Sequence, residues 1–179
     1  TKDLGPNIRI WGNRCIVCTR CVRFCEEVAG TGELCVIERG DRSVVDVFPG
    51  IPIDNPLSLN VVDICPVGAL IDKNFMYQAR VWFTKRTETV CASCSRGCNV
   101  ETTVLDNDIK RLQPRPNAEV NQHWMCDEGR LNTRYVGSDR RLLRATGLPR
   151  EIADGAKRLR FAGVISTYAT IEEMWLFKK

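Results

Sequence analysis

The sequence lacks most of the features that would place the protein in a membrane, outside the cell or among enzymes with catalytic side chains. It contains no apolar run that approaches the length of about 18 residues typical of a membrane-spanning helix. It begins without a recognisable signal peptide, so we do not expect a secreted protein whose cysteines form disulfides. No group of residues resembles a catalytic acid, base or nucleophile. Histidine is nearly absent, since His123 is the only one.

Cysteine, in contrast, is abundant, with ten residues, and eight of them form two sets with the same three-plus-one spacing. The first set is Cys15, Cys18, Cys21 and Cys65, and the second is Cys91, Cys94, Cys98 and Cys126. Three cysteines in one tight loop can reach three corners of an iron–sulfur cluster, and a fourth from a distant segment completes the site. The spacing therefore predicts two [4Fe–4S] clusters, one for each set, and an electron-transfer protein.

The fourth ligand of the first set has two candidates. Cys25 is the nearer one, but Glu26 follows it, whereas the bacterial ferredoxin run places proline after its fourth cysteine. In this sequence the proline follows Cys65, and no second triplet of cysteines precedes that residue. We therefore expect Cys65 to complete the first site. Cys25 and Cys35 are expected to pack as small hydrophobic residues, in keeping with the usual burial of free cysteine.

Zinc is the main alternative to iron, because it also binds four cysteines. Zinc sites generally use two close pairs of ligands, whereas each set here divides into three and one. This favours iron–sulfur clusters, and a zinc-stabilised interaction module without a redox role is the competing hypothesis. The formal charge of +4 does not favour a nucleic-acid partner, because two oxidised clusters would each add about −2.

Hydrophobic patterning and turn residues predict a mixture of short strands and helices. In the first part we expect strands over residues 8–11, 34–38 and 43–48, a helical stretch over 22–29, a loop over 48–56 and a strand soon after Cys65. In the second part we expect a strand over 87–90 and a hairpin that joins 99–105 to 109–113. A helix is expected to follow Cys126 over 127–135, with backbone N–H groups at its start directed towards sulfur.

Three segments carry a resemblance to a known family. The sequence NRCIVCTRCVRFCEEVAGTGEL at 13–34, followed by NVVDICPVGAL at 60–70 and ARVW at 79–82, resembles the large iron–sulfur subunit of respiratory complex I. The second cysteine set, with CDEGR at 126–130, is similar to the iron–sulfur domain of molybdopterin oxidoreductases, which bacterial forms of that subunit also carry. The resemblance implies an α+β fold. It comprises a ferredoxin-like [4Fe–4S] domain at 1–86, a β-rich molybdopterin-oxidoreductase-type [4Fe–4S] domain at 87–140, and the start of an α/β domain at 141–179.

The function implied by this resemblance is electron relay in an NADH-quinone oxidoreductase. Single electrons would pass between clusters, from a partner subunit that binds NADH and flavin (FMN) towards quinone. The implied location is the cytoplasmic peripheral arm of a membrane-attached complex, with no membrane span in this chain. The alternative is an electron-transfer subunit of an NAD-linked hydrogenase or formate dehydrogenase. Relatives of formate dehydrogenase are expected to show two ferredoxin-type cysteine runs, and this sequence has one.

The sequence also departs from the family. The family's N-terminal [2Fe–2S] domain, its site with one histidine and three cysteine ligands, and most of its large molybdopterin-like domain are not found here, so we expect a fragment. No molybdopterin is predicted. If one were bound, Arg130 could lie between it and the second cluster. His123 is expected at the surface or in support of a ligand, because each set already contains four cysteines.

Overall fold

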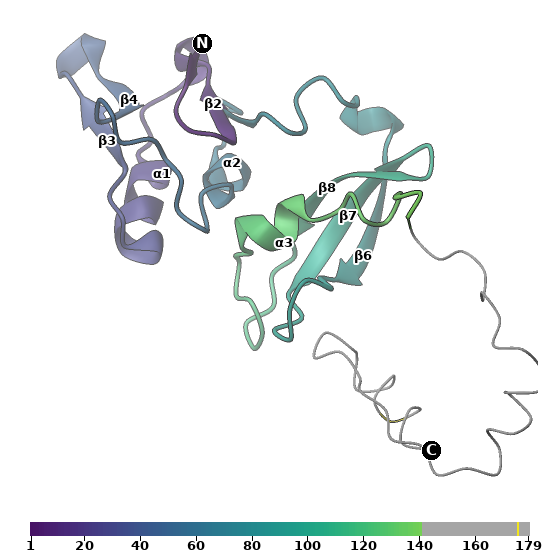
Figure 1. The fold of residues 1–179 in the computed structure, drawn as a ribbon. Coiled ribbons are helices and arrows are strands. Elements are labelled where there is room, and N and C mark those ends of the chain that lie inside the picture. The colour runs from purple at the N-terminus through teal and green to yellow at the C-terminus, as the bar shows by residue number, and fades with distance from the viewer. Residues whose placement is uncertain (141–174, 176–179) are drawn as a thin grey trace, which may run out of the picture.

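The structure is a computed structural model, and it describes residues 1–140 and residue 175 (Figure 1). Short strands at the beginning of the chain form an antiparallel sheet in the order β1 (Lys2–Asp3), β2 (Ile8–Ile10) and β5 (Leu70–Asp72). Ile8 and Ile10 are buried, while the intervening Arg9 lies on the opposite face, as the alternation of side chains along a strand requires. The pairing of β2 with β5 returns the segment after Cys65 to the beginning of the chain.

The helical stretch expected after the first cysteines is confirmed. α1 (Arg20–Arg23) continues directly into a π-helical turn, Phe24–Ala29. The two strands expected over 34–38 and 43–48 are also confirmed, as β3 (Leu34–Ile37) and β4 (Val44–Val47), which pair antiparallel. α2 (Asn60–Ile64) then leads to Cys65.

The second part of the chain is built on a three-stranded antiparallel sheet in the order β6–β7–β8. β6 (Lys85–Val90) is the exposed edge strand, and β7 (Asn99–Leu105) and β8 (Asp108–Pro114) form the predicted hairpin. Asp106 and Asn107 both have positive φ, which is the backbone conformation of the two-residue turn that matches the twist of paired strands. The hairpin prediction is therefore confirmed.

The helix after Cys126 is shorter than expected. α3 spans Asp127–Leu131, and the chain leaves the helical conformation at Asn132, whose ψ is 62°. Asparagine and the following Thr133 are weak helix formers, since their side chains compete for backbone hydrogen bonds. The prediction of a helix to residue 135 is thus wrong by one turn.

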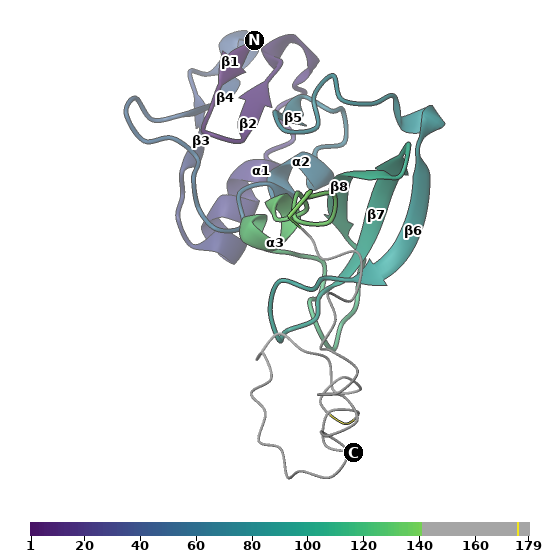
Figure 2. The same ribbon diagram turned by 45° about the vertical axis from the view of Figure 1, so that its right-hand side comes forward.

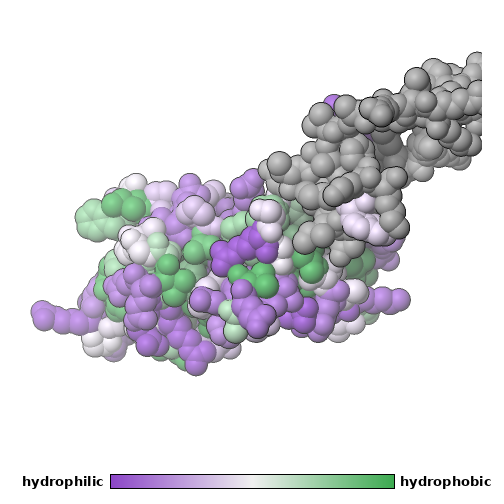
Figure 3. All heavy atoms as spheres, turned by 90° about the horizontal axis from the view of Figure 1, so that it is seen from below, coloured by the Kyte–Doolittle hydropathy of each residue, from purple (hydrophilic) through white to green (hydrophobic). Residues whose placement is uncertain are grey.

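The two parts of the chain share packing at their junction, where α3 lies beside α2 (Figure 2). Trp124 packs edge-on against Phe24 of the first part, with ring centroids 4.8 Å apart. The face seen in Figure 3 is largely hydrophilic, with hydrophobic residues scattered among the polar ones. Within the described residues, no helix has the length and apolar character needed to cross a membrane. The mixture of short helices and strands confirms the α+β class, and the α/β segment expected at 141–179 lies outside the described residues.

Candidate metal centres

The first four-cysteine set comes together in the structure. Cys15, Cys18, Cys21 and Cys65 all line one cavity, although Cys65 is far from the other three in sequence. The remaining lining is mainly apolar and comes from Ile10, Ile16, Val45, Val67, Ala69 and Leu70, with Thr19 and the cationic Arg20 beside them. The cavity thus gathers the four cysteines that the sequence analysis grouped, and their role as ligands stays a prediction.

The loop that carries the first three cysteines has an unusual backbone. Val17 and Thr19, on either side of Cys18, have φ values of 51° and 59°, in the left-handed region. This region costs an L-residue roughly 1–2 kcal/mol and is exceptional for a β-branched side chain. Strain of this kind persists where surrounding structure fixes the backbone, and it concentrates at functional sites. Here it winds the chain so that three cysteines face one cavity.

Backbone N–H groups donate to two sulfur atoms of the first set. Val17 N lies 3.4 Å from Cys15 Sγ, and Ala69 N lies 3.3 Å from Cys65 Sγ. Burial raises the pKa of the Cys21 thiol to about 11, and the neighbouring Cys15 and Cys18 act in the same direction. Thiolates packed together in this way are stable only beside a strong positive charge such as that of iron, with hydrogen-bond donors in support.

The second set is held by the ends of the β6–β8 sheet and by α3. Cys91 follows β6 and Cys98 precedes β7, and Cys91 N donates to Cys98 O at 2.8 Å. Gly97, with φ of 62°, allows the tight turn between Cys94 and Cys98. Burial raises the pKa of the Cys98 thiol, and the charges of the other three cysteines of the set contribute to this shift. Cys94 is the exposed member of the set.

Cys126 joins the second set from the start of α3. Its Sγ accepts a hydrogen bond from Gly129 N at 3.3 Å, which is the N-terminal donation that the sequence predicted. A Cβ atom at position 129 would lie 3.0 Å from Cys91 Sγ and 3.3 Å from Cys126 Sγ. Two sulfur atoms of the set, contributed by distant segments, therefore meet over a glycine that leaves room for them.

The cysteines outside the two sets are packed differently. Cys25 is completely buried in the hydrophobic core of the first part, and burial raises the pKa of its thiol to about 12. Cys35 is half-buried in β3, with its thiol 3.6 Å from Asp46 O. His123 is exposed and contacts the edge of the Trp124 ring.

The donor chemistry of both sets fits iron–sulfur clusters. Each set presents four thiols from a short loop and one distant segment, with N–H groups directed at sulfur and, in the first set, a mainly apolar wall. A site for a single metal ion is a different arrangement, because it needs at least three ligands close together. Among residues 1–140, no histidine, cysteine or carboxylate side chains form such a group.

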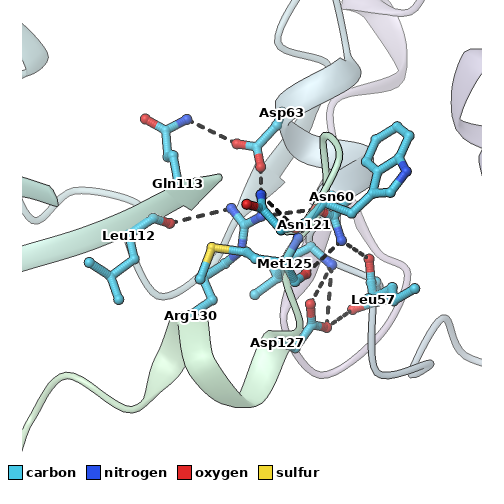
Figure 4. A network of polar contacts seen from close by, with 12 residues as sticks. Leu57, Asn60, Asp63, Leu112, Gln113, Asn121, Met125, Asp127 and Arg130 are labelled. Carbon is cyan, nitrogen blue, oxygen red and sulfur yellow. Dashed lines mark hydrogen bonds and ion pairs between the residues drawn. The ribbon is translucent and has the colours of Figure 1, made fainter. Parts of the chain in front are cut away.

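A buried polar network between the two sites is the feature that sequence reasoning did not predict (Figure 4). It joins α2, which ends just before Cys65, to the segment around Cys126. Arg130 is only 5% exposed, and its Nη2 lies 2.6 Å from Asp63 Oδ2. The only signal in the sequence was the presence of opposite charges close to the last cysteine of each set.

Comparisons with known proteins agree with this two-site arrangement. Residues 5–71 match the family described as the ferredoxin-like domain of NADH-quinone oxidoreductase subunit 3, and residues 84–138 match the molybdopterin oxidoreductase Fe4S4 domain. An NADH-quinone oxidoreductase subunit of Rickettsia felis is 31% identical over 192 aligned positions, which cover 99% of this chain and 29% of that protein. The mitochondrial NADH-ubiquinone oxidoreductase 78 kDa subunit of Neurospora crassa is 40% identical over 130 positions, covering 73% of this chain and 18% of that protein.

The chain thus spans less than a third of the length of these relatives. Both matched domains are of iron–sulfur type, and they follow each other in the order that the structure shows for the two cysteine sets. Over most of its length, the chain is thus homologous to the large iron–sulfur subunits of NADH-quinone oxidoreductases.

Proposed function

We propose that this chain is an electron-relay subunit of an NADH-quinone oxidoreductase with two [4Fe–4S] clusters. Cys15, Cys18, Cys21 and Cys65 would hold the first cluster, and Cys91, Cys94, Cys98 and Cys126 would hold the second. The observation that carries the proposal is the shared cavity lined by all four cysteines of the first set. The names of the relatives supply the class of complex.

The roles of the chain's own residues follow from the geometry of the sites. A [4Fe–4S] cluster, when bound, supplies a centre that takes up and releases one electron. The N–H groups of Val17, Ala69 and Gly129 donate to ligand sulfurs and stabilise the negative charge on them. The apolar wall of the first cavity restricts water, and Arg20 places a positive charge at its edge. These are the means by which a protein sets the potential of a cluster.

The wider assembly is proposed by analogy with the relatives. A partner subunit that binds NADH and FMN would supply electrons, and the onward path would lead to quinone. The chain would lie in the peripheral arm, on the cytoplasmic side of the membrane. We assign the first site to a domain over residues 1–86 and the second to a domain over 87–140, and we expect no molybdopterin at the second site.

The decisive experiment is anaerobic purification followed by analysis of iron and acid-labile sulfide. We expect about eight of each per chain, and two distinct [4Fe–4S] signals in the electron paramagnetic resonance (EPR) spectrum of the reduced protein. Zinc without sulfide would contradict the proposal and support the interaction module. Recovery of the native complex with a nickel–iron or molybdenum subunit, in place of membrane subunits, would instead identify a hydrogenase or formate dehydrogenase.

A further inference from the structure

The segments that deliver the last cysteine of each set are bound to one another. Asp63 lies two residues before Cys65, and Arg130 lies four residues after Cys126. Their side chains form an ion pair with Arg130 Nη2 2.6 Å from Asp63 Oδ2. Gln113 of β8 donates from Nε2 to the other carboxylate oxygen of Asp63 at 2.9 Å, so the β6–β8 sheet is bound to the same residue.

A second link joins the beginning of α2 to the residue before Cys126. Asn60 Nδ2 donates to Met125 O at 2.8 Å, and Asn60 Oδ1 accepts from Met125 N at 3.2 Å. The side-chain amide thus pairs with both backbone groups of one residue. Asn60 is completely buried and Met125 is 2% exposed, so neither backbone group could exchange this partner for water without opening the junction.

A third link fixes the first turn of α3 against the segment that precedes α2. Asp127, the residue after Cys126, accepts from Ser58 Oγ at 2.5 Å and from Leu59 N at 3.0 Å. Asp127 N donates to Pro56 O at 2.8 Å. In Figure 4 the side chain of Asp127 projects from α3 towards this segment, whereas that of Arg130 projects towards Asp63 and Leu112.

These links form a directional and largely buried connection: Asn60, Met125, Asp127 and Arg130 are buried, while the Asp63 side chain is 19% exposed at the edge of the junction. Hydrogen bonds in a low-dielectric interior are strong, and a buried charge that loses its partner is costly, so α2 and α3 resist separate movement. Cys65 and Cys126 are each within two residues of an anchored residue. A displacement of one ligand segment must therefore strain the other.

We propose that Asp63 and Arg130 are positioning residues that couple the two cluster sites, so that the state of the second site affects how firmly the first site retains its cluster. The proposal rests on the proposed function, since it requires both sites to bind clusters. It gives Arg130 a role that does not depend on a molybdopterin, because its guanidinium is engaged by the first domain.

The test is a set of single and double variants. One change impairs the second site at a residue that takes no part in the network between α2 and α3. Cys94→Ser serves this purpose, because Cys94 is exposed and makes none of the hydrogen bonds that join α2 to α3. The full chain is treated with an iron chelator under anaerobic conditions. The measurement is the rate at which the EPR signal of the first cluster disappears. We expect Cys94→Ser to accelerate this loss by about fivefold or more, the lower end of typical coupling between sites.

The same Cys94→Ser change is then made with Arg130→Gln. We expect the acceleration to be reduced, since the ion-pair link is already broken while the links of Asn60 and Asp127 remain, and we expect Arg130→Lys to retain more of it. Arg9→Gln is the matched control, because Arg9 forms an ion pair of similar length with Asp3 inside the first domain. With Arg9→Gln the acceleration should persist.

The outcomes separate this proposal from the proposed function. If the wild-type chain holds both clusters and Cys94→Ser leaves the loss rate of the first cluster unchanged, the coupling is refuted while the relay function stands. An acceleration that Arg130→Gln leaves undiminished would refute the assigned residues. A wild-type chain without iron and sulfide would overturn both proposals.

If Arg130→Gln does not fold, Asp63→Asn replaces it, because the Asp63 side chain is 19% exposed and tolerates substitution better than the buried Arg130.

Discussion

Replacement of Gly129 by alanine tests whether Cys91 and Cys126 bind a common cluster. In an ordinary helix this change would stabilise the protein by about 1 kcal/mol, because glycine is a poor helix former. Gly129 lies within α3, and its backbone does not require glycine for conformational reasons. Helix propensity alone therefore predicts a harmless or favourable substitution.

Packing against the two sulfurs predicts the opposite. The new Cβ would lie 3.0 Å from Cys91 Sγ and 3.3 Å from Cys126 Sγ, whereas carbon makes comfortable contacts at about 3.5–4.0 Å. One sulfur or the helix must retreat by roughly 0.5–1 Å. Metal–ligand distances tolerate only about 0.2 Å. We therefore expect Gly129→Ala to lose the second cluster and keep the first.

The assay is iron and sulfide content after anaerobic purification, together with EPR of the reduced protein. Iron should fall by about half, and one of two signals should disappear. Gly137→Ala is the control, because nothing lies within 4 Å of a Cβ atom at that position. A Gly129→Ala protein with full iron content and an unchanged spectrum would refute the placement of these two sulfurs around one cluster.

Three further predictions concern the first site. Cys65→Ser should abolish the signal of the first cluster and spare the second. Cys25→Ser should keep both signals but lower the free energy of unfolding by about 1–3 kcal/mol, since it buries a hydroxyl in the core; loss of a cluster in Cys25→Ser would reverse the ligand assignment. Val17→Gly should change the unfolding free energy by less than about 1 kcal/mol, because relief of left-handed strain offsets the added flexibility of glycine. Denaturant titration measures both values, with Val22→Gly as the comparison. Val22 lies at a buried helical position, so this change should lower the unfolding free energy by more than about 2 kcal/mol. Equal losses of unfolding free energy in the two variants would show that the φ of Val17 stores no strain.

Local sequence rules were sufficient for the elements whose geometry is determined by neighbouring residues. The spacing of two residues between Cys15, Cys18 and Cys21 confines them to one loop. Asp106 and Asn107 supply the turn of the β7–β8 hairpin. The proline after Cys65 pointed to the residue that the fold brings to the same cavity as the triplet.

The contacts between distant segments could not be predicted in this way. Asn60, Asp63 and Arg130 are polar, and polar residues are most often exposed, so their identity carries no direct sign that they meet in a buried junction. The length of α3 was missed for a related reason. The start of the helix is defined by Cys126 and its N–H donor, but its end depends on the weak helix formers at 132 and 133.

The polar nature of the junction gives it a property that an apolar junction would lack. The hydrophobic effect is not directional, whereas each hydrogen bond of the Asn60–Met125 and Asp127–Ser58 links holds only in one register. Cys65 lies at the end of α2, and Cys126 lies at the start of α3. If Cys65 and Cys126 bind clusters as proposed, a shift of either helix by a fraction of an ångström would move a ligand sulfur beyond the tolerance of about 0.2 Å. The register of α2 against α3 would then help to fix the positions of Cys65 and Cys126.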